Sequence, residues 1–217
     1  MLRGLIFDMD GVIIDNSDMH IKAFEIFLAR YGVSDPFTPD MFGRRNEQIL
    51  QMLLPTEIYE SKGWRALSEE KEEVYRETFR DEMVPVAGLL SLLESAKSQG
   101  IKCAIGSSAC RANVEFTMDV TSIRPLIDAW CCEDDVREGK PNPEVYIKTA
   151  ARMGLKPEEC IVFEDATAGI TAGKRAGCHV VALTTSNSRE MLQTTEADLI
   201  IDDFRDITIE QLKALLG

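Results

Sequence analysis

Residues 5–15, with the sequence LIFDMDGVIID, join a short apolar run to two aspartates that stand one residue apart. We expect residues 3–8 to form a strand, which places Asp8 at the carboxyl edge of a sheet, where open α/β sheets bind their ligands. If the chain stays extended, Asp10 points to the same side. Burial and mutual repulsion both penalise two such carboxylates, so the pair favours a neighbouring cation. An acidic turn after a strand is the alternative.

The composition is that of a globular protein with an excess of acidic residues. Of the 217 residues, 45% are hydrophobic and 28% are charged, which allows one large domain or two small ones. The net charge of -13 argues against general binding to nucleic acids or anionic membranes, so an anionic substrate would need a local positive patch. Neither a signal-peptide pattern nor an apolar stretch of about 18 residues is found. We therefore expect a soluble, cytoplasmic protein, either a monomer or a small homo-oligomer.

The six cysteines do not have the spacing of a metal site. No C-x-x-C pair occurs and only two histidines accompany them, so zinc is not expected. Four of them fall in or beside expected strands, where cysteine behaves as a small buried hydrophobe. These are Cys103, Cys131, Cys160 and Cys178. We expect structural thiols that stay reduced in the cytoplasm.

Residues 16–84 have the apolar spacing of helices and no pattern that indicates a strand. The longest expected helix covers residues 64–82. Its glutamates are interpreted as a solvated face, and they are Glu69, Glu70, Glu72, Glu73 and Glu77.

From residue 85 onward, short apolar runs alternate with helical segments. The expected strands cover residues 101–106, 127–131, 160–163, 178–183 and 198–201. This alternation predicts an α/β fold with a parallel sheet and right-handed crossovers. The N-terminal strand joins the same sheet, because alone it could not bury both of its faces. The helical block is therefore an insertion after the first strand.

Polar side chains follow four of these segments at what should be one edge of the sheet. They are Asp8 with Asp10, Ser107 with Ser108, Lys140, and Glu164 with Asp165. Each has an ordinary explanation: Ser107 suits a helix N-cap, Lys140 a solvated loop, and the acidic pair a helix start. Together they are the groups needed to handle a phosphoryl group.

The two N-terminal aspartates suit covalent catalysis. Asp8 is placed to attack phosphorus and form an aspartyl-phosphate. Asp10 can protonate the leaving oxygen and later activate water.

The later residues suit charge neutralisation. Asp165, with Glu164, offers the hard oxygen ligands that Mg²⁺ prefers. Lys140 can neutralise phosphate charge and hold the nucleophile ionised. Ser107, with Ser108 and the amides of the following helix start, can bind phosphate oxygens.

Four segments, in this order, resemble the haloacid dehalogenase-like superfamily, in the branch that contains β-phosphoglucomutase and small sugar-phosphate phosphatases. They are DMDGVIID (8–15), IGSSA (105–109), GKPNPEVY (139–146) and FEDATAGITAGKRAG (163–177). The resemblance spans the chain and implies an α/β, Rossmann-like core with a parallel sheet and helices on both faces. This core would comprise residues 1–15 and 85–217, and residues 16–84 would form an all-helical cap domain.

The same resemblance implies a Mg²⁺ cofactor, a covalent aspartyl-phosphate and a role for each motif residue. Asp8 and Asp165 would bind the metal by their side chains and Asp10 by its backbone carbonyl. Ser107 and Lys140 would bind phosphate.

The chain departs from the branch at Ala166, where serine is frequent. We expect this change to loosen a hydrogen bond around the metal ligands without removing a ligand.

In the cap, the GRRN segment at residues 43–46 resembles the substrate-facing loop of the family. Arg44 or Arg45 is a candidate for binding a substrate phosphate or sugar hydroxyl, although two surface arginines are equally expected. His20 is a candidate for steadying the acid/base residue, for contacting substrate or for packing. Lys71 is a weaker candidate for substrate contact.

The leading hypothesis is a Mg²⁺-dependent phosphatase of a small phosphorylated metabolite, with a sugar phosphate as the expected substrate. A β-phosphoglucomutase-type mutase would share every core residue. Asn46 stands where we would expect arginine in such a mutase, which favours the phosphatase. A dehalogenase would not need Asp10 and Asp165. A non-catalytic phospholigand-binding protein would not need a nucleophile together with an acid/base residue.

Overall fold

The computed structural model describes residues 1–34, 41 and 46–217, and these residues form two compact units. The core unit comprises Met1–Asp15 and Met83–Gly217. The helical unit comprises Asn16–Glu82.

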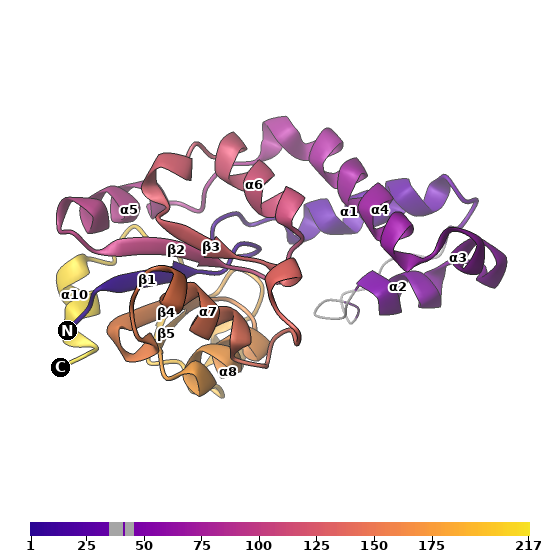
Figure 1. Cartoon of the computed structure of the whole chain (residues 1–217). Coiled ribbons are helices and arrows are strands. Elements are labelled where there is room, and N and C mark those ends of the chain that lie inside the picture. Colours follow the sequence, from indigo (N-terminus) through magenta and orange to yellow (C-terminus); the bar gives the residue numbers. More distant parts are fainter. Residues whose placement is uncertain (35–40, 42–45) are drawn as a thin grey trace. The chain divides into compact units, whose positions relative to one another are not determined.

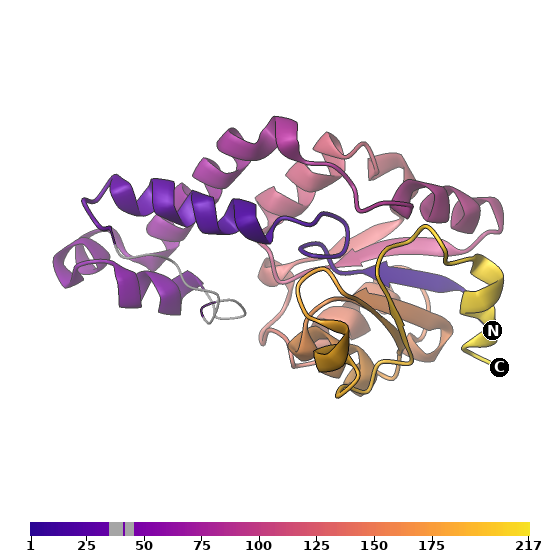
Figure 2. The same cartoon turned by 180° about the vertical axis from the view of Figure 1, so that it is seen from behind.

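The core unit is built on one parallel sheet, as the sequence predicts. Its described strands lie in the order β3-β2-β1-β4-β5-β6. They are β1 (Gly4–Phe7), β2 (Lys102–Gly106), β3 (Ala129–Cys131), β4 (Cys160–Glu164), β5 (His179–Leu183) and β6 (Leu199–Ile201). The N-terminal strand β1 runs through the middle of the sheet, between β2 and β4 (Figure 2). The order reverses direction beside β1, and such a switch point is where open α/β sheets form their ligand crevice.

Helices cover both faces of the sheet, which confirms the predicted α/β fold. On one face lie α5 (Leu89–Ser98) and α6 (Arg111–Val120), and on the other lie α7 (Glu144–Arg152) and α8 (Thr167–Ala176) (Figure 1). Two short helices complete the unit, α9 (Arg189–Leu192) and α10 (Ile209–Ala214). Strands covered on both faces need near-continuous apolar runs, and β1 and β4 are buried at every position.

Alternation along the central strands divides the core into two layers. Ile6 and Val162 contribute to the apolar cluster that includes residues of α7 and α8. Phe7 and Phe163 point to the opposite face, where their rings stack with centroids 4.8 Å apart and Phe204 meets both edge-on. The central strands are therefore anchored from both sides.

The cysteines near the strands are buried, as predicted. Cys103, Cys131, Cys160 and Cys178 are free thiols with almost no exposed surface. Burial raises the pKa of Cys103 to about 12, which makes its thiol unreactive at neutral pH.

The chain leaves and re-enters the core unit at adjacent points. Ile14 forms an antiparallel bridge with Pro85, and the Val86 amide donates a hydrogen bond of 2.8 Å to the Ile13 carbonyl. The helical unit is thus inserted between two segments that are paired within the core.

The described part of the helical unit contains α-helices, a short 3₁₀ helix at Arg80–Glu82 and no strand. The α-helices are α1 (Ser17–Ala29), α2 (Asn46–Leu53), α3 (Thr56–Lys62) and α4 (Trp64–Phe79). The long α4 packs against α1 and α2 and buries Leu67, Val74 and Tyr75.

In the described residues of both units, every helix is too short or too polar to cross a membrane.

One glutamate of α4 was wrongly predicted to be solvated. Glu69, Glu73 and Glu77 are exposed, but Glu72 is buried, with 6% of its surface accessible. Helical spacing places it three residues before the buried Tyr75, on the inner side of α4. Its Oε1 accepts hydrogen bonds from Lys71 at 2.9 Å and Asn46 at 2.8 Å.

Candidate functional site

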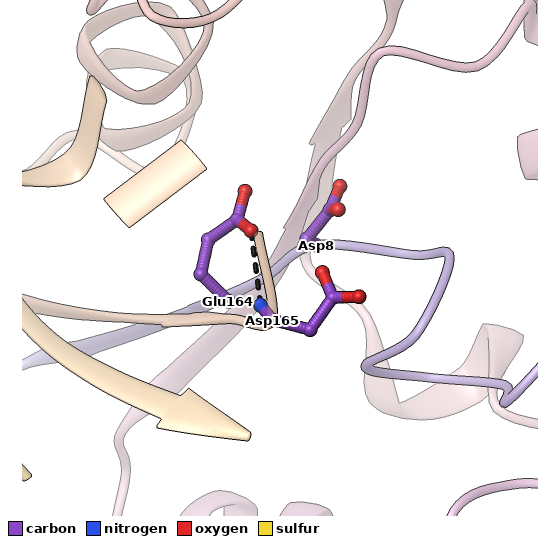
Figure 3. A group of neighbouring side chains, drawn as sticks. All are labelled: Asp8, Glu164 and Asp165. Carbon is purple, nitrogen blue, oxygen red and sulfur yellow. Dashed lines mark hydrogen bonds between the residues drawn. The ribbon is translucent and has the colours of Figure 1, made fainter. Parts of the chain in front are cut away.

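The pairing of β1 with β4 brings three carboxylates together at the carboxyl edge of the sheet. Asp8 directly follows β1, Glu164 ends β4, and Asp165 comes next. The Asp8 amide donates a hydrogen bond of 3.0 Å to the Phe163 carbonyl, which continues the ladder to this point. One oxygen from each carboxylate lies within 4.8 Å of the others. Figure 3 shows the side chains of Asp8, Glu164 and Asp165 grouped at the strand ends, with their carboxylates on the same side.

Lys140 joins this group from the loop before α7. Its Nζ lies 2.8 Å from Asp8 Oδ1 and 2.6 Å from Glu164 Oε1, and 9% of its side chain is exposed. The ammonium also lies 5.0 Å from the centroid of the Tyr146 ring. The sequence predictions for Asp8, Lys140, Glu164 and Asp165 therefore fall on residues that are close together in space.

The charges of the cluster are not balanced. Burial raises the pKa of Asp8 to about 7, against the opposing effect of Lys140. Burial, together with Glu164 and Asp8, raises the pKa of Asp165 well above its ordinary value. Burial lowers the pKa of Lys140, but its two carboxylate partners outweigh this and raise it above the ordinary value. Among the described residues, the Lys140 ammonium contacts two of the three carboxylates and lies near the third, so a further cation would stabilise the ionised cluster.

The donor set fits a hard divalent cation. Asp8 and Asp165 are largely buried and offer carboxylate oxygens within 4.8 Å of each other, and such oxygens are the ligands that Mg²⁺ and similar ions prefer. The group is therefore able to hold a metal ion.

The Glu164 carboxylate accepts several hydrogen bonds from the rest of the protein. Its oxygens accept hydrogen bonds from the Tyr146 hydroxyl at 2.5 Å and from the amides of Asp165 and Ala166 at 3.0 and 3.2 Å. A Cβ at Gly169 would lie 1.7 Å from Glu164 Oε1, so only glycine leaves room for this carboxylate beside the start of α8. Glu164 thus orients Lys140 and also offers a ligand atom to the metal group.

The turn after β1 carries Asp10. Gly11 has φ +76°, a conformation that favours glycine, and its amide donates a hydrogen bond of 2.7 Å to the Ile14 carbonyl. A Cβ at Gly11 would lie 1.9 Å from Asp165 Oδ2, so this glycine also permits close approach to the cluster. Among the described residues, the metal group does not include the Asp10 side chain. The negative charge of Asp10 nevertheless contributes to the raised pKa of Asp8.

Ser107 and Ser108 follow β2, the other neighbour of β1. Ser107 is buried and its Oγ accepts a hydrogen bond of 3.0 Å from the Ala109 amide, while Ser108 is exposed. The ordinary explanation of Ser107 as a helix N-cap is wrong, because α6 begins at Arg111 and Cys110 precedes it. A local serine turn accounts for the difference.

The proposed substrate-contacting residues of the cap have different outcomes. Arg44 and Arg45 lie outside the described residues. His20 stacks on Tyr75 with ring centroids 4.1 Å apart, and its Nδ1 lies 2.9 Å from Lys71 Nζ. Lys71 is 1% exposed and forms an ion pair of 2.9 Å with Glu72. Both side chains thus have partners within the helical unit.

Sequence reasoning missed side chains that support the carboxylates. Tyr146 lies within the GKPNPEVY segment, and its motif position was the available signal. Thr185, Ser186 and Asn187 follow β5 and bond to Gly11 or Asp165. A polar run after a strand is an ordinary loop composition, so nothing in the sequence linked these three residues to the site.

The sequence also matches known proteins. Residues 5–183 match the family model described as haloacid dehalogenase-like hydrolase. The fructose-1-phosphate phosphatase of Escherichia coli (strain K12) is 34% identical over 182 residues, which cover 82% of this chain and 94% of that protein. The phosphorylated carbohydrates phosphatase of Thermotoga maritima is 30% identical over 183 residues, covering 81% of this chain and 82% of that protein.

A solved structure has the same fold over the whole chain. The crystal structure of β-phosphoglucomutase from Clostridium difficile aligns with a TM-score of 0.81 and 26% sequence identity. The alignment covers 100% of this chain and 97% of that one.

Proposed function

Because the chain belongs to the haloacid dehalogenase-like hydrolase family and is a phosphatase of that family, we propose that it hydrolyses a small sugar phosphate in a Mg²⁺-dependent reaction that passes through an aspartyl-phosphate. The observation that carries this proposal is the cluster at the end of β1 and β4, where Lys140 contacts Asp8 and the Asp165 carboxylate lies beside it. A nucleophile, a cation-binding carboxylate and a fixed ammonium are the groups that this chemistry requires.

In the first step, an oxygen of Asp8 attacks phosphorus and the bond from phosphorus to the sugar oxygen breaks. Asp10 gives its proton to that leaving oxygen. In the second step, Asp10 takes a proton from water as the water oxygen attacks the phosphorus of the aspartyl-phosphate. Inorganic phosphate leaves and the Asp8 carboxylate is restored.

Charge neutralisation is shared among the other residues. Asp8 and Asp165 would hold Mg²⁺ with their side chains, and the ion would neutralise the phosphoryl oxygens. Lys140 neutralises a further oxygen and favours the ionised form of Asp8, since its Nζ is 2.8 Å from the carboxylate. Ser107 and Ser108, at the neighbouring strand end, are the proposed ligands for the remaining phosphate oxygens.

The substrate class is supported by the relatives whose names specify fructose 1-phosphate and phosphorylated carbohydrates. Roles for His20, Arg44 and Arg45 in substrate selection stay predictions. The cytoplasmic location and the oligomeric state also stay predictions from the sequence.

A mutase is the second candidate, supported by the β-phosphoglucomutase structure. The two reactions share Asp8, Asp10, Lys140 and Asp165 and differ in the fate of the aspartyl-phosphate. A phosphatase transfers the phosphoryl group to water, and a mutase transfers it to a second sugar hydroxyl.

Phosphate release from a panel of sugar phosphates, with Mg²⁺ or with EDTA, tests the proposal. We expect release that requires Mg²⁺ and is lost in Asp8→Asn. Asp15→Asn is the matched control, because it makes the same change at an exposed aspartate of the same segment. Release that persists in EDTA or in Asp8→Asn would overturn the mechanism. No release from any sugar phosphate, with conversion of β-glucose 1-phosphate after addition of a bisphosphate primer, would favour the mutase.

A further inference from the structure

Three consecutive side chains after β5 reach the candidate site. The Thr185 hydroxyl donates a hydrogen bond to the Gly11 carbonyl. The Ser186 hydroxyl is hydrogen-bonded to the Asp165 carboxylate. The Asn187 amide donates a hydrogen bond of 2.9 Å to the Asp165 backbone carbonyl. We call Thr185, Ser186 and Asn187 the β5 clamp.

The sheet order explains how the β5 clamp arrives there. β5 pairs with β4 in parallel, and Ala182 lies opposite Glu164. The chain after β5 therefore passes beside Asp165 before α9 begins at Arg189.

The contact with the site is direct because Gly11 has no side chain. A Cβ at Gly11 would lie 1.9 Å from Asp165 Oδ2 and 2.8 Å from Ser186 Oγ, so the carboxylate, the hydroxyl and the Gly11 backbone meet at one point. The next residue after Asp165 is Ala166, which has no hydroxyl. Ser186 is thus the hydroxyl that reaches this carboxylate from another strand end.

The residues on either side of the clamp serve the local structure instead. The Thr184 hydroxyl donates a hydrogen bond of 2.7 Å to Asp202. The Ser188 hydroxyl accepts a hydrogen bond of 3.3 Å from the Met191 amide and caps α9. Two threonines and two serines in one segment therefore divide into a pair that faces the site and a pair that does not.

We propose that the β5 clamp positions the Asp165 carboxylate and the Gly11 turn, and thereby sets the affinity of the site for its divalent cation. This inference rests on the proposed function, because it takes Asp165 as a metal ligand. Hydrogen bonds from surrounding residues fix the orientation of ligating carboxylates, and their removal commonly weakens metal binding about 10- to 100-fold. Thr185, Ser186 and Asn187 act here as positioning residues that do not touch substrate.

The test is the affinity of the substrate-free protein for Mn²⁺, measured from the electron paramagnetic resonance signal of the free ion. Ser186→Ala and Thr185→Val are compared with their matched neighbours Ser188→Ala and Thr184→Val. We expect each clamp variant to bind Mn²⁺ about tenfold more weakly than wild type. We expect both neighbour variants to stay within about twofold, because their hydroxyls bond elsewhere.

Conservative variants separate positioning from folding. Ser186→Thr and Thr185→Ser keep a hydroxyl and should restore Mn²⁺ affinity to near the wild-type value. The melting temperature of each variant in EDTA reports folding without metal, and the clamp variants should match their neighbours. Clamp variants that bind Mn²⁺ as tightly as the neighbour variants would overturn the inference. So would a wild-type protein that does not bind Mn²⁺.

This assay is independent of the proposed reaction. A wild-type protein that binds Mn²⁺ but releases no phosphate would contradict the phosphatase while leaving the clamp supported by its affinities. Full phosphatase activity with unchanged Mn²⁺ affinity in the clamp variants would contradict the clamp alone.

Discussion

The core unit and the helical unit each bury one lysine against carboxylate and aromatic groups, but with different charge balance. Lys140 contacts Asp8 and Glu164, with Asp165 beside them, and lies over the Tyr146 ring. Lys71 pairs with Glu72 and lies 4.5 Å from the centroid of the Phe24 ring. Among the residues that the structure describes, the Lys71 ammonium pairs with one carboxylate, whereas the Lys140 ammonium contacts two and lies beside a third. We expect the Lys71–Glu72 pair to stabilise the helical unit, whereas the cluster around Lys140, which we call the unbalanced cluster, is able to hold a further cation.

The largest loss of kcat is expected on substitution of Asp10. Asp10→Asn removes the proposed acid/base group, and the turnover number should fall about 10²- to 10⁴-fold. Measurement of kcat with the preferred sugar phosphate checks this, with Asp15→Asn as the control. A loss below about tenfold would remove Asp10 from the mechanism.

The second-largest loss of kcat is expected at Lys140, the ammonium of the unbalanced cluster. Lys140→Met deletes the charge that contacts Asp8, and kcat should fall about 10²- to 10³-fold in saturating Mg²⁺. Steady-state kinetics on the metal-loaded enzyme test this. Near wild-type turnover would show that the cation alone neutralises the phosphoryl group. Lys140 would then have no role in the reaction that distinguishes it from Lys71.

The Lys71–Glu72 pair should affect stability. Lys71→Met removes the ammonium that lies 2.9 Å from the buried Glu72 carboxylate, and the free energy of unfolding should fall by about 3 kcal/mol in urea titrations. Adding Glu72→Leu to Lys71→Met replaces the buried carboxylate with an apolar side chain and should recover most of that loss. A Lys71→Met variant with unchanged stability and lowered kcat would assign this lysine to the reaction.

Metal addition should stabilise the unbalanced cluster. At a Mg²⁺ concentration 100 times its dissociation constant, the free energy of unfolding should rise by about 2.7 kcal/mol. Thermal unfolding with Mg²⁺ and with EDTA measures this shift. The shift should shrink in Asp165→Asn and persist in Lys71→Met, and an equal shift in all three proteins would place the ion elsewhere.

The smallest effect is expected at Asp135, which lies outside the site and forms ion pairs with Arg152 and Arg111. Arg152 holds the pKa of Asp135 below its ordinary value, and its two nitrogens lie 2.8 and 3.0 Å from the carboxylate. A depressed folded-state pKa contributes stability above the unfolded pKa of about 4, and this contribution is lost as the pH falls below that value. Asp135→Asn should therefore cost about 2 kcal/mol at neutral pH and progressively less at lower pH. A cost that is independent of pH would mean that the charge contributes nothing.

Periodicity and motif order predicted the fold well because both are local properties. The expected strand over residues 160–163 lies within β4, and the parallel sheet follows from the alternation of strands and helices. The site residues Asp8, Lys140 and Asp165 were predicted because each follows an expected strand or lies in a recognised segment.

The remaining features depend on contacts between distant parts of the chain. Glu72 belongs to a row of glutamates, and only the packing of α4 shows that it faces inward. Ser186 meets Asp165 because β5 lies beside β4, and strand order is not encoded in either segment. Gly169 is required by the Glu164 carboxylate, whereas the sequence shows only a small residue in a helix.

The paired entry and exit of the helical unit have a consequence for how such an enzyme can diversify. The bridge between Ile14 and Pro85 holds the two connections together within the core, so the inserted chain begins and ends at neighbouring points. An insertion whose ends already meet can change length at little entropic cost to the sheet that carries it. The catalytic strands and the inserted helices can therefore vary as separate modules, one keeping the chemistry while the other is exchanged.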